Sequence, residues 1–431
     1  MSVVSQHIVG SESFFSKSRG ISGKLRKASE DFEVEEIVSI PGRSHWIWMQ
    51  DSSNGKHQIA KIKAKNWDTH VLVKALSRKL HIGQKSIGFA GTKDKRAITT
   101  QYFSLKTSVE KLSTIDLENI KLDFQHSSIK PIRLGNLVGN KFKIKVTNSK
   151  CSEDHINNIL SELRGFFPNY FGVQRFGAVR PITHIVGEKI VQGDYEGAVL
   201  DYLTLSSPNF GGHEGREYLL KTKDFTGSLE KFPPHMLFER QLLGHLSRNK
   251  EDYTGAILQL PESLSKMLVH GYQSLIFNKV LDMRIREGMD ACLPQIGDCI
   301  MPADGYGGPD QRVTIEVTER NQSKLSKRCR EGKAWIAGLL PGAKSTFSKG
   351  RQGELEKHVM NEFRVKFEDF VIDDIPELSS YGMYRPLFQK YNDINVDFDS
   401  EDPVFTFWLH KGTYATSFLR EIMKSLDVTV Y

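Results

Sequence analysis

The sequence has only four cysteines in 431 residues, and no two of them form a C-x-x-C pair. A disulfide framework or a cysteine-based zinc site is therefore not predicted, and a reducing compartment such as the cytoplasm fits best. No apolar run approaches the roughly 20 residues that span a bilayer. The first 17 residues also lack a basic segment followed by an apolar one, so no signal peptide is predicted.

Several common catalytic and nucleotide-binding motifs are missing as well. The chain has no G-x-x-x-x-G-K-[ST] loop, no G-x-G-x-x-G that opens a helix after a strand, and no H-E-x-x-H pair. It also has no G-x-S-x-G elbow. No motif therefore supports a P-loop nucleotidase, a dinucleotide-binding enzyme, a zinc protease or a serine hydrolase.

The composition is that of a globular protein, with 39% hydrophobic and 26% charged residues. The length predicts two or three domains. The net charge is +7, but residues 56–96 hold eleven lysines and arginines against two acids. This basic stretch is either a solvated face or a phosphate-binding surface, and charge alone does not decide between them. Residues 392–402 are acidic and are expected to form an exposed loop, with a cation site as the alternative.

Periodicity predicts alternating strands and helices in the first 180 residues. Strands are expected at 29–40, 45–50, 85–91, 99–106 and 142–146, and helices at about 68–79 and 155–167. Helices dominate from about 180 to 380. Residues 404–425 read as a strand, a turn and a helix with Leu419, Ile422 and Met423 facing inward. The pattern predicts a mixed sheet interrupted by a large helical insertion.

The stretch AGTKDKRAITTQ places Asp94 among three cations, Lys93, Lys95 and Arg96, on a loop between two predicted strands. Such a loop can be a set of surface ion pairs that contribute little. It can also be an active site in which the cations keep one carboxylate ionised beside an anionic partner. Similarly, residues 168–177, which contain Arg175, form either a plain loop or an RNA surface with stacking faces and a guanidinium.

Five blocks together resemble the TruD family of tRNA pseudouridine synthases. They are EDFEVEEI, AGTKDKRAITTQ, GNLVGNKF, NYFGVQRFG and GTYATSFLREIMK, and the long insertion resembles the archaeal and eukaryotic branch. The resemblance implies an α+β fold with a mixed, largely antiparallel catalytic sheet interrupted by an α/β insertion domain. The implied boundaries are 1–177 and 381–431 for the catalytic domain and 178–380 for the insertion.

The same resemblance implies the activity and its partners. Uridine in tRNA, at position 13 in the best-known members, would be isomerised to pseudouridine in the cytoplasm, without a cofactor or a metal. RNA would bind between the two domains. Two alternatives stay open: a non-catalytic RNA-binding protein on the same scaffold, and a synthase that acts on another RNA or another tRNA position.

Site residues follow from the matching motifs. Asp94 matches the catalytic aspartate, and the implied pocket consists of Glu30, Phe32, Asn140, Phe142 and Tyr414. The family's usual lysine six residues before Phe32 is replaced by Arg26, with Lys27 next to it, and the sequence does not decide which takes its role. Predicted RNA contacts are Arg26, Lys27, Lys93, Lys95, Arg96 and Arg175.

This assignment is consistent with the chemistry. A stacked uracil must be flipped out at a cost of roughly a few kcal/mol, and stacking on an aromatic face returns about 1–3 kcal/mol. Asp94 would act either as a nucleophile or as a base at the sugar. Phe32 and Phe142 have a plainer alternative, since aromatic residues at alternating strand positions are often core residues.

Overall fold

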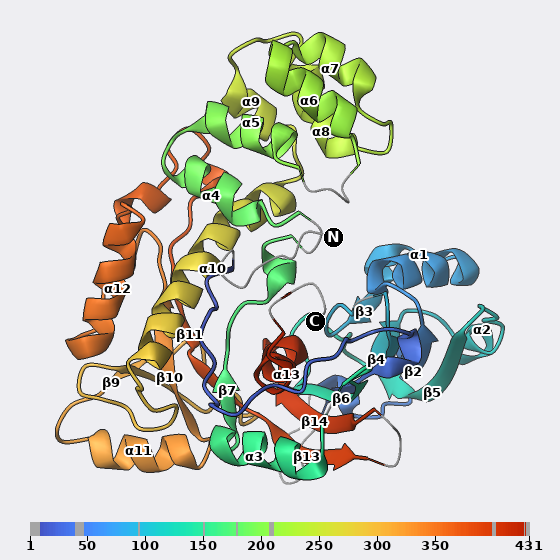
Figure 1. Ribbon diagram of the computed structural model, residues 1–431. Coiled ribbons are helices and arrows are strands. Elements are labelled where there is room, and N and C mark those ends of the chain that lie inside the picture. Colours follow the sequence, from blue (N-terminus) through green and yellow to red (C-terminus); the bar gives the residue numbers. More distant parts are fainter. Residues whose placement is uncertain are drawn as a thin grey trace.

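The computed structural model describes residues 9–38, 47–93, 95–149, 151–177, 180–206, 211–398, 402–425 and 427. One half of the molecule is built on an eight-stranded sheet (Figure 1). Its strands, in spatial order, are β13 (Asn392–Asp397), β14 (Val404–His410), β6 (Gly139–Lys145), β1 (Phe32–Ile37), β4 (Ile98–Leu105), β2 (His57–Lys65) and β5 (Ile120–Ser128), and β3 (Ile87–Phe89) pairs with β4.

The sheet is mixed and largely antiparallel, as the sequence predicted. The strands β1 and β4 are parallel, with Glu33 opposite Ile98, whereas β1 and β6 are antiparallel. The ladder between β14 and β6 runs from Val404 opposite Lys145 to His410 opposite Gly139. The strand near residue 404 therefore returns to the sheet that begins at residue 32.

Helices α1 (Thr69–Leu80), α2 (Val109–Leu112), α3 (Glu153–Leu163) and α13 (Ala415–Met423) accompany this sheet (Figure 1). Asp68 caps α1, since its carboxylate accepts hydrogen bonds from the backbone N–H groups of His70 and Val71. The side chains of Leu72 and Leu76 pack against the buried face of β2. The inward residues predicted for the last helix, Leu419, Ile422 and Met423, are fully buried.

Strand β1 has a charged residue on its buried face. Phe32 and Val34 are buried, and the next inward residue is Glu36, whereas Ile37 is only half-buried. Strict alternation of side chains requires this, because residues 32, 34 and 36 share one face of a strand. A carboxylate therefore occupies a core-facing position.

Two predicted elements are wrong. Within the predicted strand 45–50, residues Ile47–Met49 form a 3₁₀ turn, and residues 45 and 46 lie outside the described part. The actual strand is β2, whose lysines alternate with buried apolar residues. Within the predicted loop 392–402, residues 392–397 form the edge strand β13, while 399–401 are not described. Acidic side chains on an edge strand discourage pairing with other chains.

The second half is mainly helical, as predicted (Figure 1). Its helices are α4 (Thr183–Val191), α5 (Tyr195–Thr204), α6 (His213–Thr222), α7 (Phe225–Lys231), α8 (Leu237–Leu246), α9 (Tyr253–Ile257), α10 (Glu262–Arg286), α11 (Gln322–Arg330) and α12 (Gly350–Glu362). A second sheet has the order β11 (Met383–Pro386), β10 (Ala334–Leu340), β8 (Cys299–Pro302) and β9 (Ile315–Glu316).

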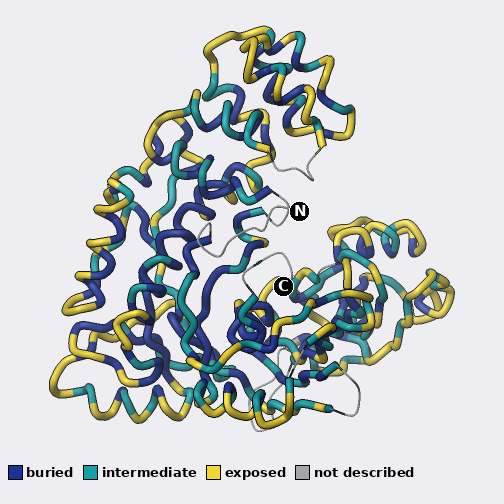
Figure 2. The backbone as a smooth tube through the Cα atoms, viewed as in Figure 1, coloured by how far each residue is buried: buried dark blue, intermediate teal, exposed yellow. Residues whose placement is uncertain are grey.

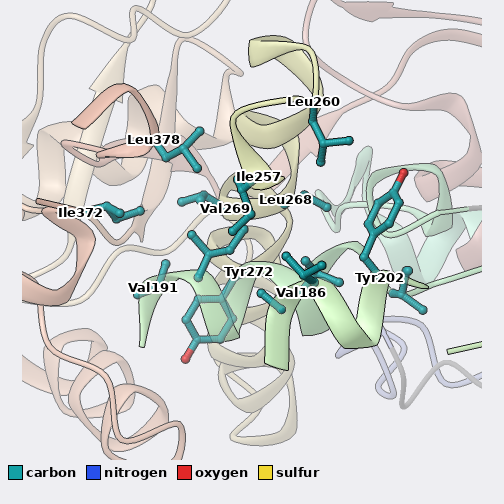
Figure 3. Packing of buried hydrophobic residues seen from close by; sticks show 14 of the residues in the cluster. Val186, Val191, Tyr202, Ile257, Leu260, Leu268, Val269, Tyr272, Ile372 and Leu378 are labelled. Atoms are coloured by element: carbon teal, nitrogen blue, oxygen red, sulfur yellow. The ribbon is translucent and has the colours of Figure 1, made fainter. Parts of the chain in front are cut away.

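Helix α10 organises this half because it is buried along most of its 25 residues. Figure 3 shows Leu268, Val269 and Tyr272 of α10 packed among side chains of α4 and the segment that contains Ile372. Figure 2 shows burial along the backbone: α10 and β10 are mostly buried, whereas the outer helices are more exposed. The large insertion thus has a core of its own.

The two halves are also joined by chain pairing. The short strand β7 (Phe166–Pro168) pairs with β12 (Phe388–Lys390), and β11 pairs with β10. The predicted domain boundary at 380/381 precedes β11, which hydrogen-bonds within the second sheet. The division into 1–177, 178–380 and 381–431 stays a prediction.

An early segment is tied to α13. The Arg420 guanidinium donates to the backbone carbonyls of Ser11 and Ser13, at 2.6 and 2.9 Å. The fully buried Glu421 carboxylate accepts from the backbone N–H of Phe15 at 2.9 Å. Burial raises the pKa of Glu421. Among the described residues no helix is long and apolar enough to cross a membrane.

Two buried histidines predict an acid-sensitive fold. Burial lowers the pKa of His184 and of His410 to about 4. Between pH 6.5 and 4 the unfolded chain binds more protons than the folded one, so the free energy of unfolding falls as the pH falls. We expect each histidine to remove about 1–2 kcal/mol of stability at pH 5 relative to pH 7.

Denaturant unfolding at several pH values measures this loss. His184→Leu and His410→Leu should each flatten the pH dependence, whatever their effect at pH 7. An unchanged slope in both variants would contradict the assignment.

Candidate functional site

A cavity of about 320 Å³ opens where β1, β4 and β6 meet the turn after β14. We call it the first cavity. Its walls come from five separate stretches of the sequence and are formed by Arg26, Phe32, Val34, Thr92, Lys93, Ala97, Thr99, Asn140, Phe142, Gln174, Gly412, Thr413, Tyr414, Ala415 and Thr416.

Six of the residues singled out from the sequence line this cavity: Arg26, Phe32, Lys93, Asn140, Phe142 and Tyr414. They are far apart in the chain and are brought together by strand pairing. Asn140 lies opposite both Glu36 of β1 and Leu409 of β14 in the sheet. The β14 ladder therefore sets the turn with Tyr414 beside the strand with Asn140.

Asp94 lies outside the described residues, but the chain on both sides of it is anchored. On one side, the Thr69 hydroxyl accepts from the Lys93 backbone N–H at 2.8 Å, and the Gln101 amide donates to the Gly91 carbonyl at 2.8 Å. On the other side, the Asn66 backbone N–H donates to the carbonyl of Ala97 at 3.1 Å. The loop therefore enters and leaves position 94 from fixed points.

A buried ion pair provides a further anchor. The Lys93 ammonium lies 2.7 Å from Oε1 of Glu36, and the two side chains are 8% and 0% exposed. The other carboxylate oxygen of Glu36 accepts from the backbone N–H of Tyr102 at 3.0 Å. Removing one partner of a buried pair is expensive because the remaining charge has no water to solvate it. The inward carboxylate of β1 thus fixes the lysine that precedes Asp94.

Aromatic rings form one wall of the first cavity. The rings of Phe32 and Phe142 meet edge to face at 6.3 Å, and Phe142 stacks on Phe407 at 5.4 Å. The guanidinium of Arg26 lies over the Phe32 ring, with its carbon 4.1 Å from the ring centroid. Both phenylalanines are buried and belong to the core of the sheet. They serve as core residues and as cavity wall together.

Asn140 and Thr413, which line this cavity, each have a buried polar atom without a hydrogen-bond partner in the part of the chain that the structure describes. The atoms are Oδ1 of Asn140 and the hydroxyl of Thr413. Buried polar groups in folded proteins are nearly always hydrogen-bonded, and an unpaired one costs about 1–3 kcal/mol. Both residues line the cavity, so a polar ligand or a water molecule bound there is one way to satisfy these atoms.

Tyr414 marks the entrance, with 37% of the residue exposed. Behind it the guanidinium carbon of Arg385 lies 4.1 Å from the Phe171 ring centroid and 5.8 Å from that of Tyr414. Arg385 also donates to the Gly412 carbonyl at 3.3 Å and to Oδ1 of Asn169 at 2.7 Å. Burial lowers the pKa of Arg385 to about 10. Sequence reasoning missed this residue because it lies outside the five blocks.

The other predicted residues do not line the first cavity. Glu30 is exposed and pairs with Lys65, whose hydrogen bond lowers the pKa of Glu30 to about 2. Lys27 and Lys95 are exposed residues. Arg96 is exposed as well, and its guanidinium donates to the backbone carbonyl of Arg26 at 3.2 Å. The Arg175 guanidinium lies 5.1 Å from the Phe171 ring centroid.

The basic stretch is partly neutralised by β1. Lysines of β2 reach glutamates of β1: Lys61 lies 2.6 Å from Glu35, and Lys63 lies 3.6 Å from Glu33. Exposed cations of this stretch include Lys74, Arg78, Lys79 and Lys85 around α1, together with Lys95. The positive surface is thus narrower than the charge count of the sequence suggested.

Comparison with known proteins is decisive at this point. The family model "tRNA pseudouridine synthase D (TruD)" matches residues 8–422. The chain belongs to the TruD family. Enzymes of this family isomerise uridine to pseudouridine in tRNA.

Individual relatives agree over nearly their whole length. A probable tRNA pseudouridine synthase D of Methanosarcina barkeri is 36% identical, with 96% of each chain covered. One from Methanosarcina mazei is 37% identical with the same coverage. The crystal structure of a candidate tRNA pseudouridine synthase D from Methanosarcina mazei matches with a TM-score of 0.86 and 36% identity, covering 100% of both chains. The α+β fold expected from the sequence is thereby confirmed.

The ion pair below the loop can be tested by stability. Glu36→Gln leaves the Lys93 ammonium buried without a carboxylate, and we expect the free energy of unfolding to fall by about 3–5 kcal/mol. The matched control is Glu35→Gln, which removes the exposed pair with Lys61 and should cost about 0.2–1 kcal/mol. Urea unfolding of both variants gives the comparison. Equal losses would show that the burial of Glu36 has no energetic role.

Proposed function

We propose that this chain isomerises uridine to pseudouridine in tRNA, with Asp94 as the catalytic carboxylate and the first cavity as the uracil pocket. The observation that carries the proposal is an aromatic-walled cavity lined by Lys93, Asn140 and Thr413, the last two with a buried polar atom that no described residue satisfies. Asp94 is the next residue in the chain. A flipped uracil has the planar faces and polar edge that such a cavity suits.

The pocket residues divide the work of holding the base. The exposed ring of Tyr414 is available for stacking, whereas Phe32 and Phe142 supply a fixed apolar wall. The side-chain amide of Asn140 has both a donor and an acceptor group. It can therefore pair with the N–H and carbonyl groups on the edge of uracil. Lys93 acts mainly by fixing the loop, because its charge is already neutralised by the ion pair with Glu36.

The reaction rearranges one nucleotide without adding or removing atoms. The bond between C1′ of the ribose and N1 of the base breaks, the base turns, and C1′ bonds to C5. C5 then loses its hydrogen as a proton and N1 gains a proton, so the atoms balance. Asp94 assists cleavage of the first bond, either as a nucleophile or as a base at the sugar. Anchoring of the loop on both sides of position 94 supports this role, since a displacement of about 1 Å can lower the rate roughly 10²-fold.

Charged residues around the cavity extend the proposal to the rest of the RNA. Arg26 lines the cavity and Lys27 is exposed, which supports Arg26 as the functional counterpart of the usual lysine. Lys95 and Arg96 are exposed residues that directly follow Asp94, and we propose that they contact phosphates. We also propose position 13 of tRNA as the target and the cytoplasm as the site of action, both by analogy with the family.

Replacement of Asp94 by Asn tests the catalytic assignment. Asn keeps the size of the side chain but removes its charge and its nucleophilic oxygen. We expect release of tritium from tRNA labelled at C5 of uridine to fall below detection, while tRNA binding is retained. Asp94→Glu should also lose about 10²-fold in rate. Near wild-type turnover by a folded Asp94→Asn enzyme would overturn the role of Asp94.

The salt dependence of binding tests the phosphate contacts. Each phosphate neutralised by a lysine contributes about −0.7 to −0.9 to the slope of log K against log salt. Lys95→Ala should reduce that slope by one such step. Lys61→Ala is the matched control, because Glu35 already neutralises this lysine, and it should leave the slope unchanged. Filter binding of tRNA at several salt concentrations decides, and equal slopes for wild type and Lys95→Ala would exclude this contact.

A further inference from the structure

A second cavity, of about 550 Å³, lies directly beside the first. Gly412 lines both cavities. The same two stretches of chain contribute to both. At or just before the start of β6, Val138 lines the second cavity and Asn140 the first; in the turn after β14, Lys411 lines the second and Thr413 the first. One wall of the second cavity therefore continues the wall of the uracil pocket.

The opposite wall is a loop of the insertion, residues 303–310, whose conformation is held by hydrogen bonds within the loop. One carboxylate oxygen of Asp304 accepts from the backbone N–H groups of Tyr306 and Gly308, at 2.8 and 3.0 Å. The Asp304 backbone N–H donates to the carbonyl of Gly308 at 2.7 Å. A bridge between Ala303 and Pro309 closes the loop. Tyr306 lies at the tip of this closed loop and lines the cavity.

The loop and the sheet meet at Lys411. Its ammonium lies 5.9 Å from the centroid of the Tyr306 ring, and it donates to the carbonyl of Gly135 at 3.0 Å. The insertion thus presents an aromatic ring across the cavity from the strand turns that also shape the uracil pocket.

The charges of the second cavity favour a neutral ligand. Asp310 pairs with Arg312, with 2.8 Å between Oδ2 and Nη2. Asp304 and Lys411 are engaged by the loop and the turn as described above. Two acids beside two cations do not suit a phosphate. A planar neutral group that stacks on an aromatic ring suits this cavity better. The cavity volume lies within the range that is usual for small-ligand pockets.

We propose that the second cavity binds the nucleobase adjacent to the target uridine in the RNA strand, with Tyr306 as its stacking platform. The inference rests on the proposed function, because only a strand that places uracil in the first cavity brings its neighbour to Gly412. Stacking is sequence-tolerant, since every base has a flat face. The insertion would in this way take part in positioning the substrate.

A double-mutant design tests this contact. The substrates are three versions of one tRNA-derived hairpin: unmodified, abasic at the 5′ neighbour of the target, and abasic at the 3′ neighbour. With the unmodified hairpin, Tyr306→Ala should raise KM about tenfold and change kcat little, and Tyr306→Phe should restore KM. With one of the abasic hairpins, wild type should show the same tenfold rise and Tyr306→Ala no further rise, because the partner base is already gone.

The control variant is Tyr381→Ala, which removes an exposed tyrosine of the same half that also has a lysine beside its ring, at 4.6 Å. It should leave KM unchanged. Additive losses for Tyr306→Ala and both abasic hairpins would overturn the stacking contact, as would equal KM values for wild type and Tyr306→Ala. Should Tyr306→Ala fail to fold, sensitivity of the wild type to either abasic site still decides, since indifference to both excludes the subsite. Failure of wild type to convert any hairpin or whole tRNA would instead refute the proposed function.

Discussion

The antiparallel ladder between β6 and β14 is the constraint on which the rest of the structure depends. Its seven residue pairs bring the turn at residues 411–414 beside the start of β6, although most of the chain lies between them in sequence. Both cavities are lined by the turn after β14 and by residues at or just before the start of β6. A shift of one residue in this register would turn Asn140 and Phe142 to the other face of the sheet. The ladder therefore fixes the composition of the site as well as the fold.

Several polar groups of the site occupy buried positions that are normally apolar or fully hydrogen-bonded. Along β1 a glutamate takes the third inward position, and its ion pair with Lys93 ties the loop of Asp94 to the sheet. Within the described residues, Asn140 and Thr413 each keep an unpartnered atom of a kind that a folded core normally satisfies. Local departures from packing and hydrogen-bonding rules concentrate at functional sites because the surrounding structure offsets them. Here the aromatic cluster of Phe142 and Phe407 provides that support.

The sequence predicted the elements with strong periodicity and missed those that depend on tertiary context. Helix α1, strand β4 and the strand–turn–helix at 404–425 were recognisable from their patterns. The aromatic run at 45–50 has the composition of a strand but contains a 3₁₀ turn. Strand β2 was missed because its lysines alternate with the apolar residues that face the core, so the segment reads as a charged run. Six cavity residues came from family motifs. Arg385 and Tyr306 could not be found this way, since their contacts with Tyr414 and Lys411 form only in the folded chain, between residues far apart in the sequence.

The docking of the segment at residues 11–16 onto α13 has a consequence for synthesis on the ribosome. While the chain is being made, this early segment has no partner until Arg420 and Glu421 have left the exit tunnel. Strand β6 likewise waits for β14 until the whole insertion has emerged. A nascent chain that ends before residue 404 contains the loop of Asp94, but it lacks residues 412–416 of the first cavity and Lys411 and Gly412 of the second. The order of the strands thus leaves both cavities incomplete until the last stretch of the chain has been made.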